Sequence, residues 1–113
     1  MCFFFILLHM TEIEKKFKET CISILNDNMS DEIFVDYTYY EMETIDLEFT
    51  SDIIEMKYCI DSIYLDDDGN IVISVYSPDY ERMGYLEHTL SEFDDNLLED
   101  ILHLIDNGEF DVY

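Results

Sequence analysis

The sequence is poor in basic residues and in the two residues that most often interrupt secondary structure. It has five Lys and Arg, one Pro and three Gly among 113 residues. So few Pro and Gly leave no stretch with the composition of a flexible linker, and the length is that of one domain. Against the five basic residues stand 28 acidic ones, a formal net charge of −23. This charge argues against direct binding to nucleic acid or to an anionic membrane.

Motifs of catalysis and of cofactor binding are missing as well. The sequence contains no Gly-rich phosphate loop and no HExxH pair, and no Ser or Cys motif marks a nucleophile. Acidic residues are so frequent that no pair stands out as an acid and a base. We therefore expect no enzyme, no cofactor and no bound metal.

The three cysteines are an odd number and include no CxxC spacing. This pattern favours free thiols in a reducing cytoplasm. Cys21 and Cys59 lie within apolar patterns, so we expect both in the core.

Residues 1–10 are mostly Phe, Ile and Leu but lack the features of a targeting segment. There is no basic region, no small residue for a cleavage site, and the apolar run is too short to span a bilayer. Two interpretations stay open. The segment is either an apolar extension, with translation starting at Met10, or an edge strand of the sheet. Residues 11–113 are expected to form a single α+β domain.

Hydrophobic periodicity predicts a helix, a series of strands and a second helix. Thr11 and Glu14 form a capping box before a helix over about 11–28. Alternation of apolar and polar residues then predicts strands. They cover about 33–40, 45–49, 54–60 and 71–76, with a further short strand possible over 85–89. The second is either a separate strand or a continuation of the first past a bulge. A last helix starts at Ser91 and ends before Gly108.

Strands joined by short turns form antiparallel sheets. The predicted fold class is therefore α+β, an antiparallel sheet of about four strands with the N-terminal and C-terminal helices packed on one face.

The loop Asp66-Asp67-Asp68-Gly69-Asn70 resembles a calcium loop at first sight. An EF-hand that starts at Asp66 needs Gly where Ile71 stands and Glu where Ser77 stands, and its flanks are helices rather than strands. Asp-Gly between two alternating apolar runs is instead typical of a hairpin turn. The sequence therefore predicts a turn that needs no metal.

The negative charge is concentrated in the strands and the last helix. Three of the five basic residues, Lys15, Lys16 and Lys18, lie in the first helix. In the strands, acidic residues alternate with apolar ones and are expected to point mainly away from the core. Rows of carboxylates on strands about 4.8 Å apart approach the charge density of duplex DNA, about one charge per 1.7 Å.

Such a surface is expected to bind a basic protein surface, above all the cationic channel of a nuclease that binds nucleic acid. Tyrosines among the acidic residues supply flat surfaces that stack on Arg. The predicted partner-binding residues are Asp36, Glu41, Glu43, Asp46, Glu48, Asp66, Asp67, Asp68, Tyr80, Glu92, Asp95 and Glu99. A solvated acidic surface with no partner is the alternative interpretation.

In size, charge and aromatic-rich α+β pattern, residues 32–113 resemble the small acidic inhibitors encoded by phages and mobile elements. These include anti-CRISPR and anti-restriction proteins, some of which mimic nucleic acid. The resemblance lies in composition and charge layout rather than in a motif, so it carries over no functional residue.

The resemblance implies a stoichiometric inhibitor of a bacterial defence nuclease, a CRISPR effector above all, in the cytoplasm of a bacterial host cell. Two alternatives stay open. One is an immunity protein that neutralises a secreted toxin such as a nuclease, and the other is an acidic regulatory or scaffold subunit. The oligomeric state is left open.

Overall fold

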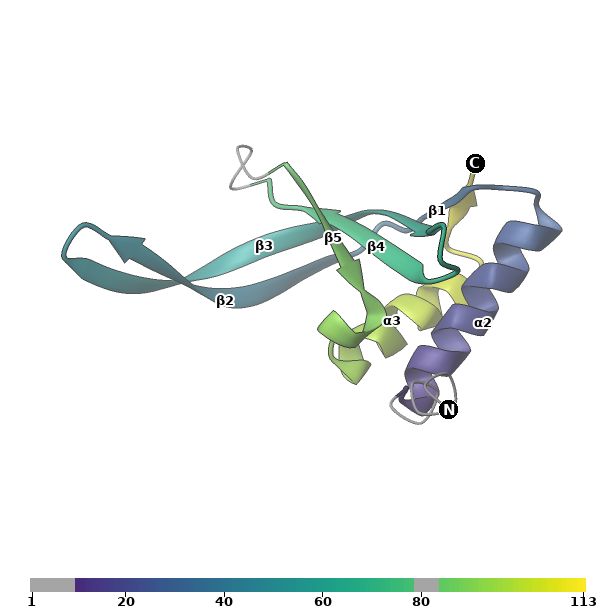
Figure 1. The fold of residues 1–113 in the computed structure, drawn as a ribbon, viewed down its shortest axis with the longest axis horizontal. Coiled ribbons are helices and arrows are strands. Elements are labelled where there is room, and N and C mark those ends of the chain that lie inside the picture. Colours follow the sequence, from purple (N-terminus) through teal and green to yellow (C-terminus); the bar gives the residue numbers. More distant parts are fainter. Residues whose placement is uncertain (1–9, 79–83) are drawn as a thin grey trace.

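A computed structural model describes residues 10–78 and 84–113. The elements are α2 (Glu12–Asp27), β1 (Glu32–Phe34), β2 (Thr38–Leu47), β3 (Thr50–Leu65), β4 (Ile71–Tyr76), β5 (Tyr85–Thr89), the 3-10 helix η2 (Leu90–Glu92), α3 (Asp95–Asp106) and β6 (Asp111–Val112) (Figure 1). The predicted α+β class with an antiparallel sheet is confirmed. Within these residues the sheet has six strands rather than about four. The prediction for the N-terminal extension falls on residues 1–9, outside the described residues.

Helix α2 begins where the sequence predicts. The Thr11 hydroxyl accepts a hydrogen bond from the Glu14 N–H at 3.1 Å, which satisfies one of the free N–H groups of the first turn. Phe17, Cys21 and Leu25 recur along one side of the helix and are buried. Burial raises the pKa of the Cys21 thiol to about 12. The prediction that Cys21 belongs to the core is therefore confirmed.

Strand β3 forms the centre of the sheet. Its C-terminal half pairs with β1 on one edge and with β4 on the other, so that Ile63 lies opposite both Ile33 and Ile73. Its N-terminal half pairs with β2. Cys59 is only half-buried in β3, so the prediction that it lies in the core is wrong. Its neighbours Tyr58 and Ile60 are the residues that face the core.

The first predicted strand is divided in two. Strand β1 ends at Phe34, residues 35–37 leave the regular pairing, and β2 then runs from Thr38 to Leu47. Of the two interpretations of residues 45–49, the separate strand is wrong, and the continuation of the first strand is the one observed, since Thr38–Leu47 forms one strand. Alternation continues across the break because both strands pair with the same edge of β3, so periodicity alone does not locate it.

The hairpin of β2 and β3 projects from the body as a two-stranded arm, residues 40–57 (Figure 1). The arm lies along the longest extent of the molecule, which is 51 Å against 36 and 25 Å for the others. Most of its side chains are exposed, because no other described strand pairs with β2 or with residues 50–58 of β3.

The predicted hairpin turn after β3 is confirmed. The Asp66 carboxylate accepts hydrogen bonds from the N–H groups of Asp68 and Asn70, at 3.0 and 2.8 Å. Gly69 has φ +83°, a backbone conformation that glycine adopts without a steric cost. Asp66 therefore stabilises its own turn.

The last helix starts later than predicted. Ser91 lies in η2, and α3 begins only after Asp94, whose carboxylate accepts a hydrogen bond from the Asn96 N–H at 2.9 Å. The prediction of a start at Ser91 is wrong because residues 90–92 form a separate 3-10 helix, and Asp94 is the residue that caps the α-helix. Gly108 follows the helix with φ +78°, as predicted. Strand β6 was not predicted, since two residues are too few to show alternation.

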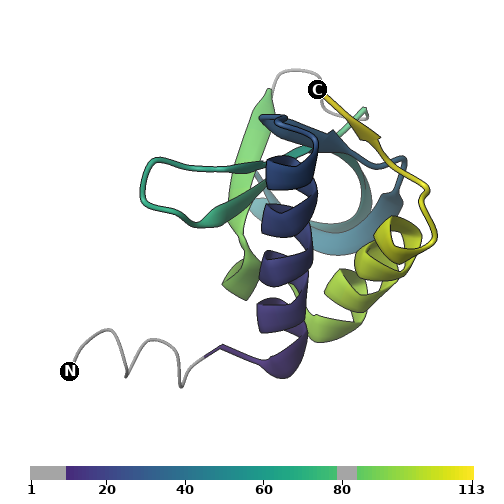
Figure 2. The same cartoon turned by 90° about the vertical axis from the view of Figure 1, so that its right-hand side faces the viewer.

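One core joins the helices to the sheet. Its fully buried side chains are Phe17, Cys21, Ile33, Ile63, Ile73, Val75, Leu98 and Ile101. Helices α2 and α3 lie next to each other in the body of the molecule (Figure 2), and the Thr11 hydroxyl donates a hydrogen bond to Asp95 at 3.1 Å. The finer expectation, that both helices cover one face of the sheet, stays a prediction.

Replacing Ile101 with Ala should lower the free energy of unfolding by about 2–5 kcal/mol, because it removes buried methyl groups and leaves a cavity. The control is Ile53→Ala on the arm, where the side chain is 64% exposed. That change should alter the free energy by less than about 0.5 kcal/mol. Urea denaturation followed by circular dichroism measures both, and equal losses would contradict this division into core and arm.

Candidate functional site

A pocket of about 300 Å³ lies where the arm leaves the body. Strands β2 and β3 form one side of it, and β5, η2 and the residue after η2 form the other. The residues that line this arm pocket are Tyr39, Glu41, Glu43, Tyr58, Leu86, His88, Glu92 and Phe93. Three predicted partner-binding residues, Glu41, Glu43 and Glu92, therefore come together in one place.

The pairing of β2 with β3 explains why these side chains share a face. Tyr39 lies opposite Tyr58, and Glu41 lies opposite Met56. Alternate residues of a strand point to the same side, so Tyr39, Glu41 and Glu43 all face the side on which the core lies. The expectation that Glu41 and Glu43 point away from the core is therefore wrong. Their carboxylates reach solvent because the hairpin has already left the body at this point.

Aromatic rings form the wall of the arm pocket. The rings of Tyr39 and Tyr58 stack with their centroids 5.4 Å apart and 20° between their planes. Phe93 approaches Tyr39 edge-on at 6.1 Å, and the His88 ring approaches Phe93 at 5.5 Å. Such contacts between packed rings hold the wall in one arrangement.

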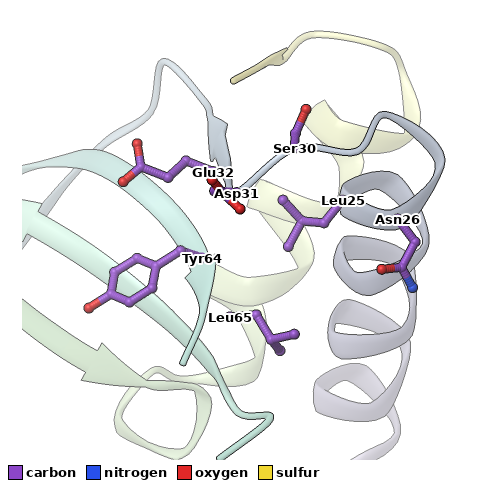
Figure 3. A pocket seen from close by; sticks show the side chains of 7 residues that line it. All are labelled: Leu25, Asn26, Ser30, Asp31, Glu32, Tyr64 and Leu65. Atoms are coloured by element: carbon purple, nitrogen blue, oxygen red, sulfur yellow. The ribbon is translucent and has the colours of Figure 1, made fainter. Parts of the chain in front are cut away.

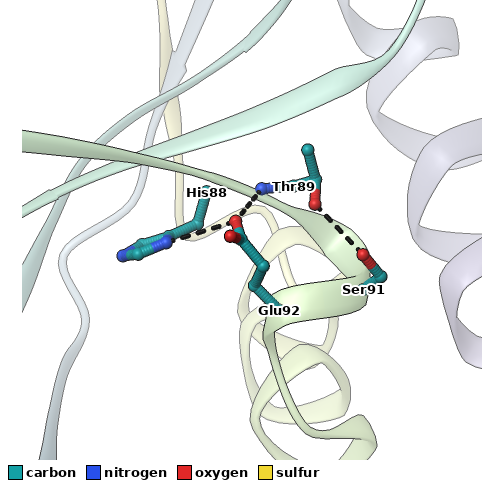
Figure 4. A network of polar contacts seen from close by, with 4 residues as sticks. All are labelled: His88, Thr89, Ser91 and Glu92. Carbon is teal, nitrogen blue, oxygen red and sulfur yellow. Dashed lines mark hydrogen bonds and ion pairs between the residues drawn. The ribbon is translucent and has the colours of Figure 1, made fainter.

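Hydrogen bonds orient two of the three carboxylates. Glu43 accepts a hydrogen bond from the Tyr58 hydroxyl at 2.8 Å. Glu92 accepts one from the Thr89 N–H at 2.7 Å and lies 3.2 Å from Nδ1 of His88 (Figure 4). In the described part of the chain, no Lys or Arg nitrogen lies within 4.0 Å of Glu41, Glu43 or Glu92. Carboxylates beside aromatic faces are suited to bind a guanidinium or an ammonium group.

The two tyrosines of the wall stay protonated at neutral pH. Burial, followed by the hydrogen bond to Glu43 and its charge, raises the pKa of Tyr58 to about 12. Burial and then the charge of Glu41 also raise the pKa of Tyr39. Tyr58 is therefore a hydrogen-bond donor that holds the Glu43 carboxylate in place.

A second pocket, of about 430 Å³, lies between the end of α2 and the end of β3. It is lined by Leu25, Asn26, Ser30, Asp31, Glu32, Tyr64 and Leu65 (Figure 3). Burial and then Glu87 raise the pKa of Tyr64 to about 12. None of the predicted partner-binding residues lines this pocket, and it has no stacked aromatic wall, so it is the weaker candidate.

The other predicted site residues in the described part of the chain do not line the arm pocket. Asp46 and Glu48 lie near the tip of the arm, Asp36 in the connection between β1 and β2, Asp66, Asp67 and Asp68 in the turn after β3, and Asp95 and Glu99 on α3. The arm tip and the turn lie at opposite ends of the 16-residue β3, a separation of up to about 50 Å. Tyr80 lies outside the described residues. Asp66 and Asp95 also hold the fold together through their hydrogen bonds.

Sequence reasoning included Tyr39 among the tyrosines that supply flat surfaces but missed the rest of the wall of the arm pocket, Tyr58, His88 and Phe93. A hairpin with its turn at Glu48 and Phe49 pairs Tyr39 with Tyr58, so the register of β2 on β3 was the available signal for the two tyrosines. His88 and Phe93 come from a later part of the chain, and no local pattern links them to the hairpin.

Comparison with known proteins yields no match, neither to a family model nor to a curated protein nor to a solved structure. Within residues 10–78 and 84–113, no helix is long and apolar enough to cross a membrane. The same residues contain no group of three or more His, Cys, Asp or Glu placed to hold a metal ion.

The stability of the protein should fall at high pH, because the folded state holds the Tyr58 proton more tightly than the unfolded chain. The pKa of Tyr58 is about 12 in the folded protein against an ordinary value of 10. Its stabilising effect is therefore complete below pH 10 and is lost as the pH rises through about 12. Tyr58→Phe should make the thermal midpoint fall less over this interval than it does in the wild type. Thermal denaturation at a series of pH values measures this, and the same pH dependence in both proteins would contradict it.

Proposed function

We propose that the protein is a stoichiometric inhibitor of a bacterial defence nuclease, acts in the cytoplasm of the host cell, and takes CRISPR effectors as its first candidate targets. It binds the basic surface on which the enzyme holds nucleic acid. The observation that supports this most is the arm pocket, where Glu41, Glu43 and Glu92 surround an aromatic wall and have no Lys or Arg partner among the described residues.

The chemistry of the arm pocket is complementary to that of a surface that binds nucleic acid. Such surfaces contact phosphates mainly through Arg and Lys. A guanidinium group that enters the pocket meets carboxylates for bidentate hydrogen bonds and tyrosine rings for stacking. A side chain held there is no longer available to a phosphate, which is the basis of the proposed inhibition.

The remaining acidic residues attract the partner from a distance. Among the described residues every Asp and Glu except Glu14 is exposed or partly exposed. A surface with one sign of charge raises the rate at which oppositely charged partners meet. The effect decreases with salt, because ions screen exposed charges beyond about 8 Å at physiological ionic strength.

The arm does not reach the charge density of duplex DNA. Its hairpin has ten residue pairs and is about 30 Å long at 3.3 Å per residue. The six acidic residues of the arm, Glu41, Glu43, Asp46, Glu48, Asp52 and Glu55, give about one charge per 5 Å. Duplex DNA carries about one per 1.7 Å. The protein therefore competes for a cationic surface without reproducing the charge density of the duplex.

The test is to add the purified protein to cleavage reactions of three groups of nucleases: guide-loaded CRISPR effectors, restriction endonucleases and secreted bacterial toxin nucleases. We expect full inhibition of one defence nuclease at an equimolar amount, with weaker inhibition as the salt concentration rises. Inhibition of a toxin nuclease alone would favour the immunity protein instead. Failure to inhibit any of them, even in large excess, would contradict the proposal.

Glu41→Lys should weaken inhibition by at least about tenfold, because it places a like charge against the basic partner. Glu41 is exposed and makes no side-chain hydrogen bond to another described residue, so the fold should tolerate the change. Glu109→Lys is the matched control, the same charge reversal at an exposed residue outside the arm pocket. Equal losses for the two variants would show that only net charge matters and would remove the pocket from the proposal.

A further inference from the structure

The arm presents apolar side chains that are largely exposed. Half of the exposed large hydrophobic residues in the described part of the chain lie on this one hairpin. They are Tyr40, Met42, Leu47, Phe49 and Ile53, of which Phe49 is 95% exposed. Apolar residues gathered on an exposed element indicate a surface that becomes buried in a complex.

Phe49 also has a backbone conformation that its side chain disfavours. It is the second residue of the two-residue turn between Leu47 and Thr50 and has φ +87°. A turn with positive φ at this position selects Gly or Asn, because a side chain there meets the backbone. A bulky aromatic residue destabilises such a turn and, when this exposed, gains no packing in return. Folding therefore does not explain why Phe stands here.

The charge around the tip decides which kind of partner fits. The arm carries six acidic residues and one basic residue, Lys57. A second copy of this chain would bring the same acidic arm and a further net charge of −23, so like charges oppose self-association. Carboxylates next to the apolar tip also oppose its insertion into an anionic membrane. A protein surface with an apolar pocket and a basic rim satisfies both the Phe ring and the carboxylates beside it.

We infer that the arm inserts its tip into the partner protein, with Phe49 as the anchor in an apolar pocket rimmed by Lys and Arg. The inference rests on the proposed function for the basic character of the partner and adds the anchor. The ten residue pairs of the hairpin place the tip about 30 Å from its base. The partner is therefore held at two points, by the arm pocket near the body and by Phe49 at the tip.

The first experiment separates the effect of Phe49 on stability from its effect on binding. Phe49→Gly relieves the unfavourable φ, so the thermal midpoint should stay the same or rise. Met29→Gly is a matched control, since Met29 is 94% exposed with φ +51° and lies outside the arm. A fall of several degrees in the midpoint of Phe49→Gly would mean that the ring stabilises the fold, and would overturn the inference.

The second experiment uses a library of short random peptides, displayed on phage and selected on the immobilised full-length protein. We expect selected peptides to combine aromatic or aliphatic residues with flanking Lys and Arg. Phe49→Gly should weaken their binding by at least about tenfold, as for a residue at the centre of an interface, and Met29→Gly should leave it unchanged.

The possible outcomes distinguish the anchor from the proposed function. Basic peptides without apolar residues, bound equally by Phe49→Gly, would overturn the anchor and leave binding to a cationic surface intact. Neutral or acidic peptides, or none, would overturn both. Two direct measurements test whether the tip binds a second copy of the chain or a membrane instead. Self-association in sedimentation equilibrium, or flotation with phosphatidylcholine vesicles, would overturn the inference if Phe49→Gly abolished it.

Discussion

The pairing of β3 with two different sets of neighbours is the constraint on which the rest of the structure depends. Its C-terminal half lies between β1 and β4, and there Ile60 and Ile63 are buried in the core. Its N-terminal half pairs with β2, and there Ile53 is exposed. An isolated two-stranded hairpin is marginally stable in water. The arm is ordered because each of its strands continues into the body, so the core stabilises an element that buries little apolar surface of its own.

The negative charge does not contribute to this stability. Within the described residues, Lys side chains lie near carboxylates at two places, Lys15 with Glu12 and Lys16 with Asp106, each at 3.9 Å and largely exposed. Exposed pairs of this kind contribute about 0–1 kcal/mol each. The other carboxylates repel one another, which opposes folding. The core has to compensate for this repulsion, so the acidic surface is a cost to the fold that a basic partner would relieve.

Sequence patterns predicted the structural features that depend on residues close together in the sequence. The N-cap at Thr11 and the turn from Asp66 to Gly69 depend on residues only a few positions apart, and both are present. The second half of the predicted capping box, a bond from the Thr11 N–H to the Glu14 carboxylate, is not formed in the described part of the chain. The arm and its pocket depend on where β2 leaves the body, and alternation is the same before and after that point. Tyr39 is buried and Glu41 is exposed although both point to the same side. Their surroundings come from β5, η2 and Phe93, which periodicity does not bring to the hairpin.

In the proposed complex, the charge and the apolar surface of the arm have different tasks. Electrostatic attraction acts over a Debye length, about 8 Å at physiological salt, and it does not distinguish one basic protein from another. A buried aromatic side chain is selective, because it binds only where a pocket of matching shape exists. The arm carries acidic residues at lower density than duplex DNA, and it holds Phe49 exposed in the turn at its tip. Charge alone would bind many nucleic-acid-binding proteins weakly, whereas charge with an anchor limits binding to a partner that offers both a basic rim and a pocket.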